Sequence, residues 1–502
     1  MDHIVLGASP EGLQSLTLKR ANRHGLVAGA TGTGKTVTLQ VLAEAFSAEG
    51  VPVFAADVKG DLSGICQAGD PPPKWAMARA EETGIAINPA AAPTVFWDVF
   101  GELGHPVRAS VTELGPMLLG RVLECSEAQE GALAIAFKLA ADWLEAGNDA
   151  GLLLDLKDLR GLLTHLAENA EEIGKTYGLV SPQTIAALQR RLLQLEVDGA
   201  DKFFGEPGLK LADLMRVTPE GKGVVNLLAA EKLIQTPRLY ATVLLWLLSE
   251  LWEELPEIGD PEKPKLVFFF DEAHLLFKDA PKALLSRIEQ VARLIRSKGV
   301  GVYFVTQSPS DVPEGVLAQL GNRVQHALRA YTPSDQKAVR AAAASFRANP
   351  GVDVVREIQE LNVGEALVSM LDEKGAPAPV TRTKVRAPNS RVGPATFQER
   401  AAVRAASGFG PQYDAPLDRQ SAHEILTLKA AKAKARMEQE ATRAAEDKAQ
   451  AKAAKADTAK PAPRKRASPV ERMATNVGSD VLRTIARELM RGIFGSGRRR
   501  RR

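Results

Sequence analysis

The chain contains few cysteines, few aromatic residues and no long apolar run. Of its 502 residues, two are Cys and 5% are aromatic. Cys66 and Cys125 are accompanied by no CxxC motif or Cys/His cluster, so they predict neither a disulfide framework nor a structural zinc site. No stretch approaches the roughly 18 uninterrupted apolar residues of a membrane span, and the N-terminus MDHIVLGASPEG lacks the layout of a secretory signal. We therefore expect a cytoplasmic protein without a transmembrane segment.

The small net charge of +3 hides an uneven distribution. Residues 421–502 contain 21 Lys and Arg against 9 Asp and Glu, whereas residues 1–420 contain 43 against 52. The overall proportions, 45% hydrophobic and 25% charged, are those of a soluble globular protein. The acidic balance of residues 1–420 argues against extensive nonspecific contact between their exterior and DNA, whereas the basic tail suits a polyanion.

Between residues 23 and 372, short apolar runs alternate with helical patterns, which is typical of a parallel sheet covered by crossover helices. The predicted fold class is therefore α/β, with a mainly parallel sheet and flanking helices. Most of the expected strands end near Gly, Asp, Asn or a hydroxyl residue, where an open α/β sheet places its ligand loops. These strands are 25–28, 51–56, 94–99, 223–228, 266–270, 300–306, 327–330 and 365–370.

Changes in composition divide the chain into six parts. Helical periodicity replaces strand signals in 104–220, and residues 428–468 have almost no large apolar side chain. The proline- and charge-rich run after Lys374 predicts an extended connector that cannot bury a core. The expected division is 1–103, first part of the core; 104–220, a helical insertion; 221–385, second part of the core; 386–427, a connector; 428–468, a flexible Ala/Lys-rich segment; and 469–502, a basic amphipathic helix with an arginine tail.

The C-terminal segment combines an apolar stripe with basic residues. Leu482, Ile485, Leu489 and Ile493 share one helical face, and five arginines end the chain. Three roles stay open for this segment: packing or assembly through the apolar stripe, electrostatic binding of nucleic acid, and docking on an anionic membrane surface.

Residues 29–36 form a complete phosphate-binding motif. GATGTGKT matches G-x-x-x-x-G-K-[ST], follows the apolar run GLVA and precedes a helical pattern. Backbone N–H groups and the helix N-terminus would cradle phosphate oxygens, Lys35 would reach the β- and γ-phosphates of ATP, and the Thr36 hydroxyl would bind Mg²⁺. The candidate nucleotide-binding residues are Gly29, Ala30, Thr31, Gly32, Thr33, Gly34, Lys35 and Thr36.

A buried strand that ends in acids supplies the second half of an ATP site. In KPKLVFFFDEAH, five apolar residues precede Asp271 and Glu272. We assign Asp271 to Mg²⁺, and Glu272 to the attacking water, which it would orient or deprotonate. Thr36 and Asp271 are thus the candidate metal ligands.

Two further strand ends carry polar residues. Gln307 follows the strand 300–306 and is a candidate sensor that contacts the γ-phosphate and the attacking water; the alternative is an amide that caps a turn. Asp57, Lys59 and Asp61 follow another strand, in the sequence ADVKGD. They would serve the surroundings of the metal or a partner surface, or form only a charged loop.

These motifs occur in the order found in one family of motors. NRHGLVAGATGTGKT, ADVKGD, FFFDEAH and the segment from SKGVGVYFVTQ to GNRVQHALRAYTPSDQKAV resemble the HerA/FtsK branch of RecA-type P-loop ATPases, most nearly the HerA-like bacterial family that includes YjgR. The resemblance implies a RecA-like fold and a ring, expected to be a hexamer, that moves duplex DNA and holds ATP between subunits. It also implies an arginine supplied by the neighbouring subunit, with Arg323 as the first candidate and Arg329 as the second.

The expected function is hydrolysis of ATP to ADP and phosphate by a ring motor, with DNA translocation or helicase-like activity as the leading interpretation. The predicted catalytic residues are Glu272, Gln307 and Arg323. Two alternatives stay open: an ATPase that acts on protein cargo, and a slow nucleotide-gated scaffold that docks through its basic tail on nucleic acid or membrane. Stimulation of hydrolysis by DNA separates the first interpretation from the other two.

Overall fold

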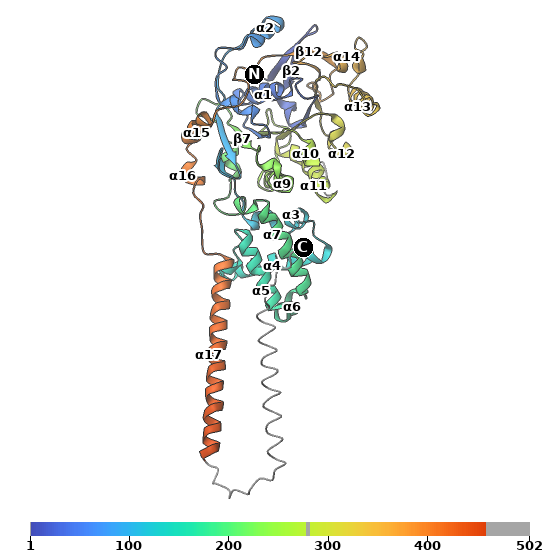
Figure 1. Ribbon diagram of the computed structural model, residues 1–502. Coiled ribbons are helices and arrows are strands. Elements are labelled where there is room, and N and C mark those ends of the chain that lie inside the picture. The colour runs from blue at the N-terminus through green and yellow to red at the C-terminus, as the bar shows by residue number, and fades with distance from the viewer. Residues whose placement is uncertain (1, 278–281, 458–502) are drawn as a thin grey trace, which may run out of the picture. The chain divides into compact units, whose positions relative to one another are not determined.

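The computed structural model describes residues 2–277 and 282–457. Within them, twelve strands form one mixed sheet in the order β2-β1-β12-β11-β10-β3-β9-β8-β4-β7-β5-β6 (Figure 1). Pairing is parallel from β10 to β6 and antiparallel from β2 to β10. The strands are β1 (His3–Ser9), β2 (Gly12–Thr17), β3 (Gly25–Ala28), β4 (Val53–Asp57), β5 (Thr94–Asp98), β6 (His105–Pro106), β7 (Val225–Ala229), β8 (Leu266–Phe270), β9 (Val300–Thr306), β10 (Asn322–Gln325), β11 (Glu365–Ser369) and β12 (Thr381–Val385).

Helices cover both faces of the sheet, which confirms the predicted fold class. All five residues of β8 are buried, and they alternate between two apolar clusters: Phe268 and Phe270 belong to one, Val267 and Phe269 to the other. The helices that flank the sheet or follow its strands are α1 (Lys35–Ala48), α2 (Lys74–Thr83), α9 (Pro237–Glu254), α10 (His274–Phe277), α11 (Lys282–Leu294), α12 (Glu314–Leu317), α13 (Pro333–Ala344), α14 (Val354–Glu360), α15 (Phe397–Ala406) and α16 (Gly410–Tyr413).

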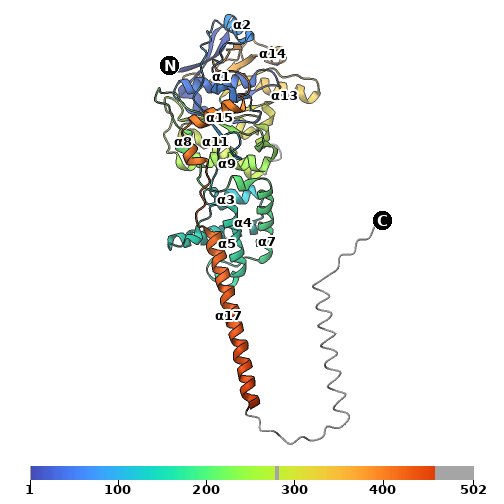
Figure 2. The same cartoon turned by 60° about the vertical axis from the view of Figure 1, so that its left-hand side comes forward.

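A group of helices lies between β6 and β7 in the chain. It comprises α3 (Val111–Val122), α4 (Glu127–Glu145), α5 (Leu156–Glu168), α6 (Ala170–Tyr177), α7 (Pro182–Val197) and α8 (Leu211–Leu214). Side-chain caps begin several of them, including Asp155, which accepts from two N–H groups of α5. Leu188 and Leu192 of α7 are buried in the same apolar cluster as Phe268 of β8. In both views α3, α4, α5 and α7 lie together on the side of α9 that faces away from the sheet (Figures 1 and 2). The group therefore continues the layer of helices to which α9 belongs.

The strand expected at 327–330 is wrong. The strand in this region is β10, which ends at Gln325. After it the chain leaves the ladder: the N–H of Ala30 donates to the Ala327 carbonyl, and the N–H of Leu328 donates to the Ile358 carbonyl of α14. Ala327 and Leu328 are buried because they pack in one apolar cluster with residues of α13 and α14, and not because they pair in the sheet.

The run after Lys374 does bury a core, contrary to expectation. Its residues 381–385 form β12, between β1 and β11. The sequence TRTKV alternates, so Thr381, Thr383 and Val385 point inward while the two basic residues stay half-exposed. The hairpin of β1 and β2 that continues the sheet beyond β12 was not predicted either.

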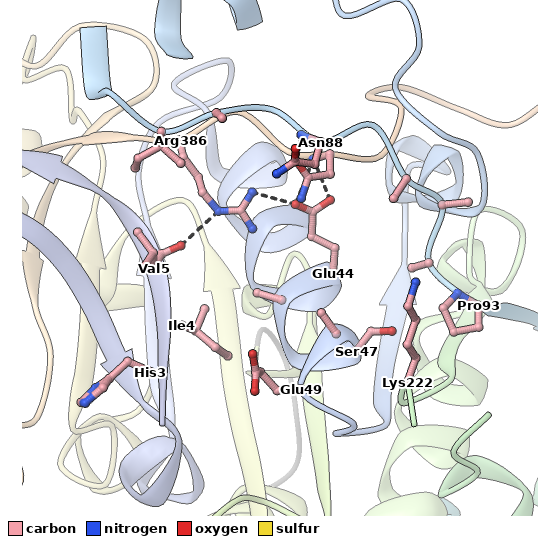
Figure 3. Close-up of a pocket in the computed structure, with 18 residues that line it drawn as sticks. His3, Ile4, Val5, Glu44, Ser47, Glu49, Asn88, Pro93, Lys222 and Arg386 are labelled. Atoms are coloured by element: carbon pink, nitrogen blue, oxygen red, sulfur yellow. Dashed lines mark hydrogen bonds and ion pairs between the residues drawn. The ribbon is translucent and has the colours of Figure 1, made fainter. Parts of the chain in front are cut away.

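Residues 386–427, expected as a connector, belong to the same compact unit as the sheet, Met1–Lys429. Glu44 of α1 fixes the start of this segment. Its carboxylate accepts from the N–H groups of Asn389 and Ser390 (both 3.0 Å), from the Ser390 hydroxyl (2.8 Å) and from the Arg386 guanidinium (2.8 Å; Figure 3). The buried Glu44 carboxylate thereby connects α1 to the residues that directly follow β12.

The last described helix is α17 (Ala422–Asp457). Just before it the Ser421 hydroxyl donates to Asp158 of α5 (2.6 Å), and Leu426 in its second turn is buried. Residues 430–451 form exposed helix in the second unit, Ala430–Arg502. The amphipathic helix and arginine tail expected at 469–502 lie outside the described residues. No helix in the described part of the chain is long and apolar enough to cross a membrane.

Replacing Glu44 tests the junction. Glu44→Ala should lower the free energy of unfolding by about 3–5 kcal/mol, because it leaves the largely buried Arg386 guanidinium without its ion-pair partner and the N–H groups of Asn389 and Ser390 without their acceptor. Urea unfolding followed by circular dichroism measures the loss. Glu82→Ala is the matched control: this half-exposed carboxylate pairs with Arg79 and Lys384 and should cost about 1 kcal/mol or less. If both variants lost the same free energy of unfolding, Glu44 would not be the residue that holds α1 to the segment after β12.

Candidate nucleotide site

The predicted phosphate-binding loop connects β3 to α1 at the carboxyl end of the parallel strands. Gly34 precedes α1 with φ +112°, which glycine adopts without strain, and the backbone of Gly364 lies 3.2 Å from the place of a Cβ there. At Gly29, a Cβ would lie 2.5 Å from the Cβ of His326. The glycines of the motif therefore allow the loop to pack closely against the ends of β10 and β11.

Backbone hydrogen bonds hold the loop from two neighbouring strands. The N–H of Gly29 donates to the Thr306 carbonyl of β9 (3.2 Å), and the N–H of Ala30 donates to the Ala327 carbonyl after β10 (2.8 Å). These contacts come from the strands on either side of β3. The loop is thus shaped by the sheet itself.

His326 supports the loop and was not singled out from the sequence. Its ring is fully buried, with Nε2 2.8 Å from the Thr38 hydroxyl of α1 and Nδ1 2.9 Å from the Glu365 carbonyl of β11. Burial lowers the pKa of His326 to about 4, so the ring is neutral near pH 7 and places no charge under Lys35. The one signal in the sequence is a polar residue at the end of the apolar pattern in NRVQHAL.

Lys35 lies folded over the loop. Its ammonium donates to the carbonyls of Gly29 (2.7 Å) and Ala30 (3.1 Å), and the residue is buried. Burial lowers the pKa of Lys35, while the nearby carboxylates of Glu272 and Asp271 act in the opposite direction. The two predicted acids are therefore within electrostatic reach of the predicted phosphate-binding lysine.

Asp271 and Glu272 follow β8 and are both buried. The N–H of Glu272 donates to Asp271 Oδ1 (2.9 Å). Burial, with the charge of Glu272, raises the pKa of Asp271 to about 6. Glu272 has φ +47°, an uncommon backbone conformation for a residue other than glycine.

The Glu272 carboxylate meets three side chains from three different strand ends. Lys59 Nζ lies 2.5 Å from Oε1, Gln307 Nε2 donates to Oε2 (3.3 Å), and His274 Nδ1 lies 3.3 Å from Oε2. Burial raises the pKa of Glu272, but the hydrogen bond and charge of Lys59 outweigh it, so the net shift is downward. Glu272 is therefore an ionised carboxylate inside a polar cluster.

Asp57 is the last residue of β4, the strand next to β8, and Lys59 lies in the loop that follows it. Asp57 is buried with Oδ2 lacking a hydrogen-bond partner, and burial, then the charges of Glu231 and Asp271, raises its pKa to about 7. Lys59 is half-exposed and reaches Glu272, so the structure places this member of ADVKGD directly against a predicted catalytic residue.

The structure brings Gln307 into the site but not Arg323. The Arg323 guanidinium is half-buried and donates to three backbone carbonyls of its own subunit, those of Leu317, Leu320 and Ser345. Arg329 is exposed and donates to the Gln359 carbonyl (3.0 Å). Neither arginine has a contact with the acids or with the loop among the described interactions.

Thr36 and Asp271 are the residues that would hold Mg²⁺. In the ranges that the structure describes, no three His, Cys, Asp or Glu side chains gather into a metal site of their own. This fits Mg²⁺ bound together with a nucleotide, since that ion takes one or two protein ligands and completes its shell with phosphate oxygens and water. The donor set, a hydroxyl and a carboxylate, is of the hard oxygen type that Mg²⁺ prefers.

A separate pocket of about 370 Å³ lies at the opposite end of α1 (Figure 3). Its lining includes Ile4, Ala45, Ala48 and Pro93, so it is largely apolar. Because α1 rises about 1.5 Å per residue, its last turn lies roughly 20 Å from Lys35. This pocket is therefore distinct from the phosphate-binding loop.

The phosphate-binding loop follows β3, two acids follow β8, and Gln307 follows β9, which lies between those two strands. This arrangement defines a RecA-like P-loop nucleotide-binding fold. The chain belongs to the helicase HerA-like C-terminal family, whose model matches residues 4–502. This bears out the resemblance to HerA/FtsK-type ATPases.

Relatives and solved structures agree with this placement. Probable helicase MJECL08 of Methanocaldococcus jannaschii is 34% identical over 125 residues, 24% of this chain and 22% of the relative. The DNA double-strand break repair helicase HerA of Sulfurisphaera tokodaii is 33% identical over 99 residues, 20% of this chain and 19% of the relative. The chain thus matches about a fifth of each relative's length. The bacterial conjugative coupling protein TrwB shares the fold, with a TM-score of 0.51 and 16% identity over 78% of this chain and 90% of that one.

Lys35→Ala tests the loop directly. Removal of an ammonium that would pair with phosphate should weaken ATP binding about 10- to 100-fold, the range of a hydrogen bond to a charged group. Titration of a fluorescent ATP analogue measures the dissociation constant. Lys74→Ala, an exposed lysine of α2, should leave it unchanged. Unchanged affinity in Lys35→Ala would remove the loop from the nucleotide site.

Proposed function

We propose that the protein is a Mg²⁺-dependent ATPase that works as a ring, expected to be a hexamer, and translocates or unwinds duplex DNA. The observation that carries the proposal is the convergence of four groups at one sheet edge: Lys35 after β3, Asp271 and Glu272 after β8, and Gln307 after β9. Family membership supports ATP as the substrate class, and the helicase names of the relatives support nucleic acid as the cargo.

Each group has a definite task in this proposal. The loop N–H groups and the α1 N-terminus bind phosphate oxygens, and Lys35 moves from the Gly29 and Ala30 carbonyls onto the β- and γ-phosphates. Thr36 and Asp271 would hold Mg²⁺, which would neutralise charge on those phosphates. Glu272 orients the attacking water and accepts its proton, and Gln307 stands beside it to contact the γ-phosphate.

For the arginine supplied by a neighbouring subunit, the contacts favour Arg329 over Arg323. Arg323 would have to give up three backbone carbonyls before it could reach another subunit. Arg329 is exposed and carries one described hydrogen bond, to Gln359. We therefore propose Arg329 as the residue that crosses the subunit boundary, while Arg323 supports β10 and the end of α13.

Replacing the two acids separately tests their roles. Glu272→Gln should lower kcat by about 10²–10⁴-fold, the usual contribution of a general base, while ATP binding stays. Asp271→Asn should weaken the Mg²⁺-dependent part of nucleotide binding. Steady-state phosphate release and a nucleotide titration with and without Mg²⁺ measure both effects. If Asp271→Asn binds normally without turnover and Glu272→Gln loses Mg²⁺ dependence, the roles are reversed.

The dependence of hydrolysis on DNA tests the cargo. Duplex DNA should raise the ATPase rate of the full-length protein. An ATPase that acts on protein cargo, or a slow scaffold, would show no increase. The same assay with Lys35→Ala is the background, since hydrolysis by a contaminant would survive that substitution.

Removal of residues 430–502 tests the basic tail. This segment contains 20 Lys and Arg against 8 Asp and Glu. Each phosphate contact adds nearly one unit to the slope of log affinity against log salt, so the truncated protein should lose most salt-sensitive DNA binding but keep its basal ATPase rate. Ending the chain at Lys429 keeps the contacts of Ser421 and Leu426. An unchanged salt slope would place DNA binding in residues 1–429.

A further inference from the structure

Lys59 contacts the proposed catalytic base closely. Its ammonium lies 2.5 Å from Glu272 Oε1, and the lysine side chain is 46% exposed whereas the glutamate side chain is 5% exposed. A charged side chain that is half in solvent thus reaches into the site and ends on a buried carboxylate.

The backbone that carries Lys59 is firmly held. Gly60 has φ +77°, and its carbonyl accepts from the Ser63 hydroxyl (2.6 Å). Ser63 in turn accepts from the N–H of Ala395 (2.7 Å). Next to Gly60, the buried Arg400 of α15 donates to Glu231 (3.0 Å). The loop is therefore fixed by the segment that follows β12, so that a change at Lys59 is confined to its flexible side chain.

Both oxygens of the Glu272 carboxylate are engaged. Oε1 pairs with Lys59, and Oε2 accepts from Gln307 and faces His274. A general base must offer a free lone pair to the water it deprotonates. In this arrangement the charge of Glu272 is paired with Lys59, and three side chains occupy positions around a carboxylate that has about four lone-pair sites.

We infer that Lys59 is a positioning residue that restrains Glu272 in a resting arrangement, in part also after nucleotide has bound. The triphosphate carries more negative charge than one carboxylate and competes with Glu272 for the Lys59 ammonium, so Oε1 is free for the attacking water in only a fraction of the ATP-bound molecules. The inference rests on the proposed ATPase function, since it concerns the base of that reaction. It predicts that the protein hydrolyses ATP more slowly than it would if Glu272 were not paired with the Lys59 ammonium.

The test variant removes the positive charge of Lys59 and keeps the length of its side chain. Lys59→Met should raise the kcat for ATP in the absence of DNA by about two- to fivefold, the factor that corresponds to one half-exposed ion pair. Its KM should not fall, because the contact between the Lys59 ammonium and the triphosphate is lost as well. Lys59→Arg keeps the charge and should return the rate toward that of the unsubstituted protein. Thermal unfolding of each variant checks that the fold is intact.

Lys232→Met is the matched control. Lys232 lies 2.5 Å from Glu102, with side chains 53% and 59% exposed, so it forms an ion pair of the same length away from the site. This variant should leave kcat unchanged. In the double variant Lys59→Met, Glu272→Gln, the gain should vanish and the rate should equal that of Glu272→Gln.

Three outcomes would overturn the inference, and each points to a different cause. A folded Lys59→Met protein that hydrolyses ATP no faster than the unsubstituted protein shows that Lys59 does not restrain the base, while the ATPase function stands. Equal rates for the unsubstituted protein and Glu272→Gln show that Glu272 is not the base, and the proposed mechanism fails together with the inference. A gain in Lys59→Met that persists with Glu272→Gln shows that Lys59 acts elsewhere.

Discussion

Parallel pairing of β3, β9, β8 and β4 is the constraint on which the site depends. The register aligns Ala28 with Thr306, and Phe270 with both Phe304 and Ala56. Because the strands run the same way, the residues that follow them all emerge at one edge. The phosphate loop, Gln307, the two acids and the ADVKGD loop are thereby brought together from widely separated positions in the chain.

The second constraint is electrostatic. Burying Lys35, Asp271, Glu272 and Asp57 in one small region costs free energy unless each charge meets an opposite charge or a hydrogen bond. In the structure Lys35 donates to two backbone carbonyls, Asp271 accepts from a backbone N–H, and Glu272 pairs with Lys59. A bound nucleotide with its metal would replace each of these internal partners by phosphate oxygens and a cation. The same contacts that stabilise the nucleotide-free site would therefore have to rearrange when nucleotide binds.

Much of this site could be predicted from sequence because its motifs are local. The phosphate loop and the strands 266–270 and 300–306 depend on contiguous residues, and β8 and β9 have the predicted bounds. Features that depend on distant partners were not predictable in the same way. β12 is polar and short, and is recognisable as a strand only beside β1 and β11, and the pairing of Lys59 with Glu272 joins residues more than 200 positions apart. Arg323 is a candidate through family resemblance, and this resemblance carries no information about the three backbone carbonyls that the Arg323 side chain contacts.

The most direct test of the account is a structure of the protein with Mg²⁺ and a non-hydrolysable ATP analogue. We expect the triphosphate in the loop 29–36, the Lys35 ammonium moved from the Gly29 and Ala30 carbonyls onto phosphate oxygens, and Mg²⁺ bound by Thr36 and Asp271. Its γ-phosphate should face Glu272 and Gln307. A triphosphate bound elsewhere, or one in the loop whose γ-phosphate points away from both residues, would contradict the central claim that this sheet edge is the hydrolytic site.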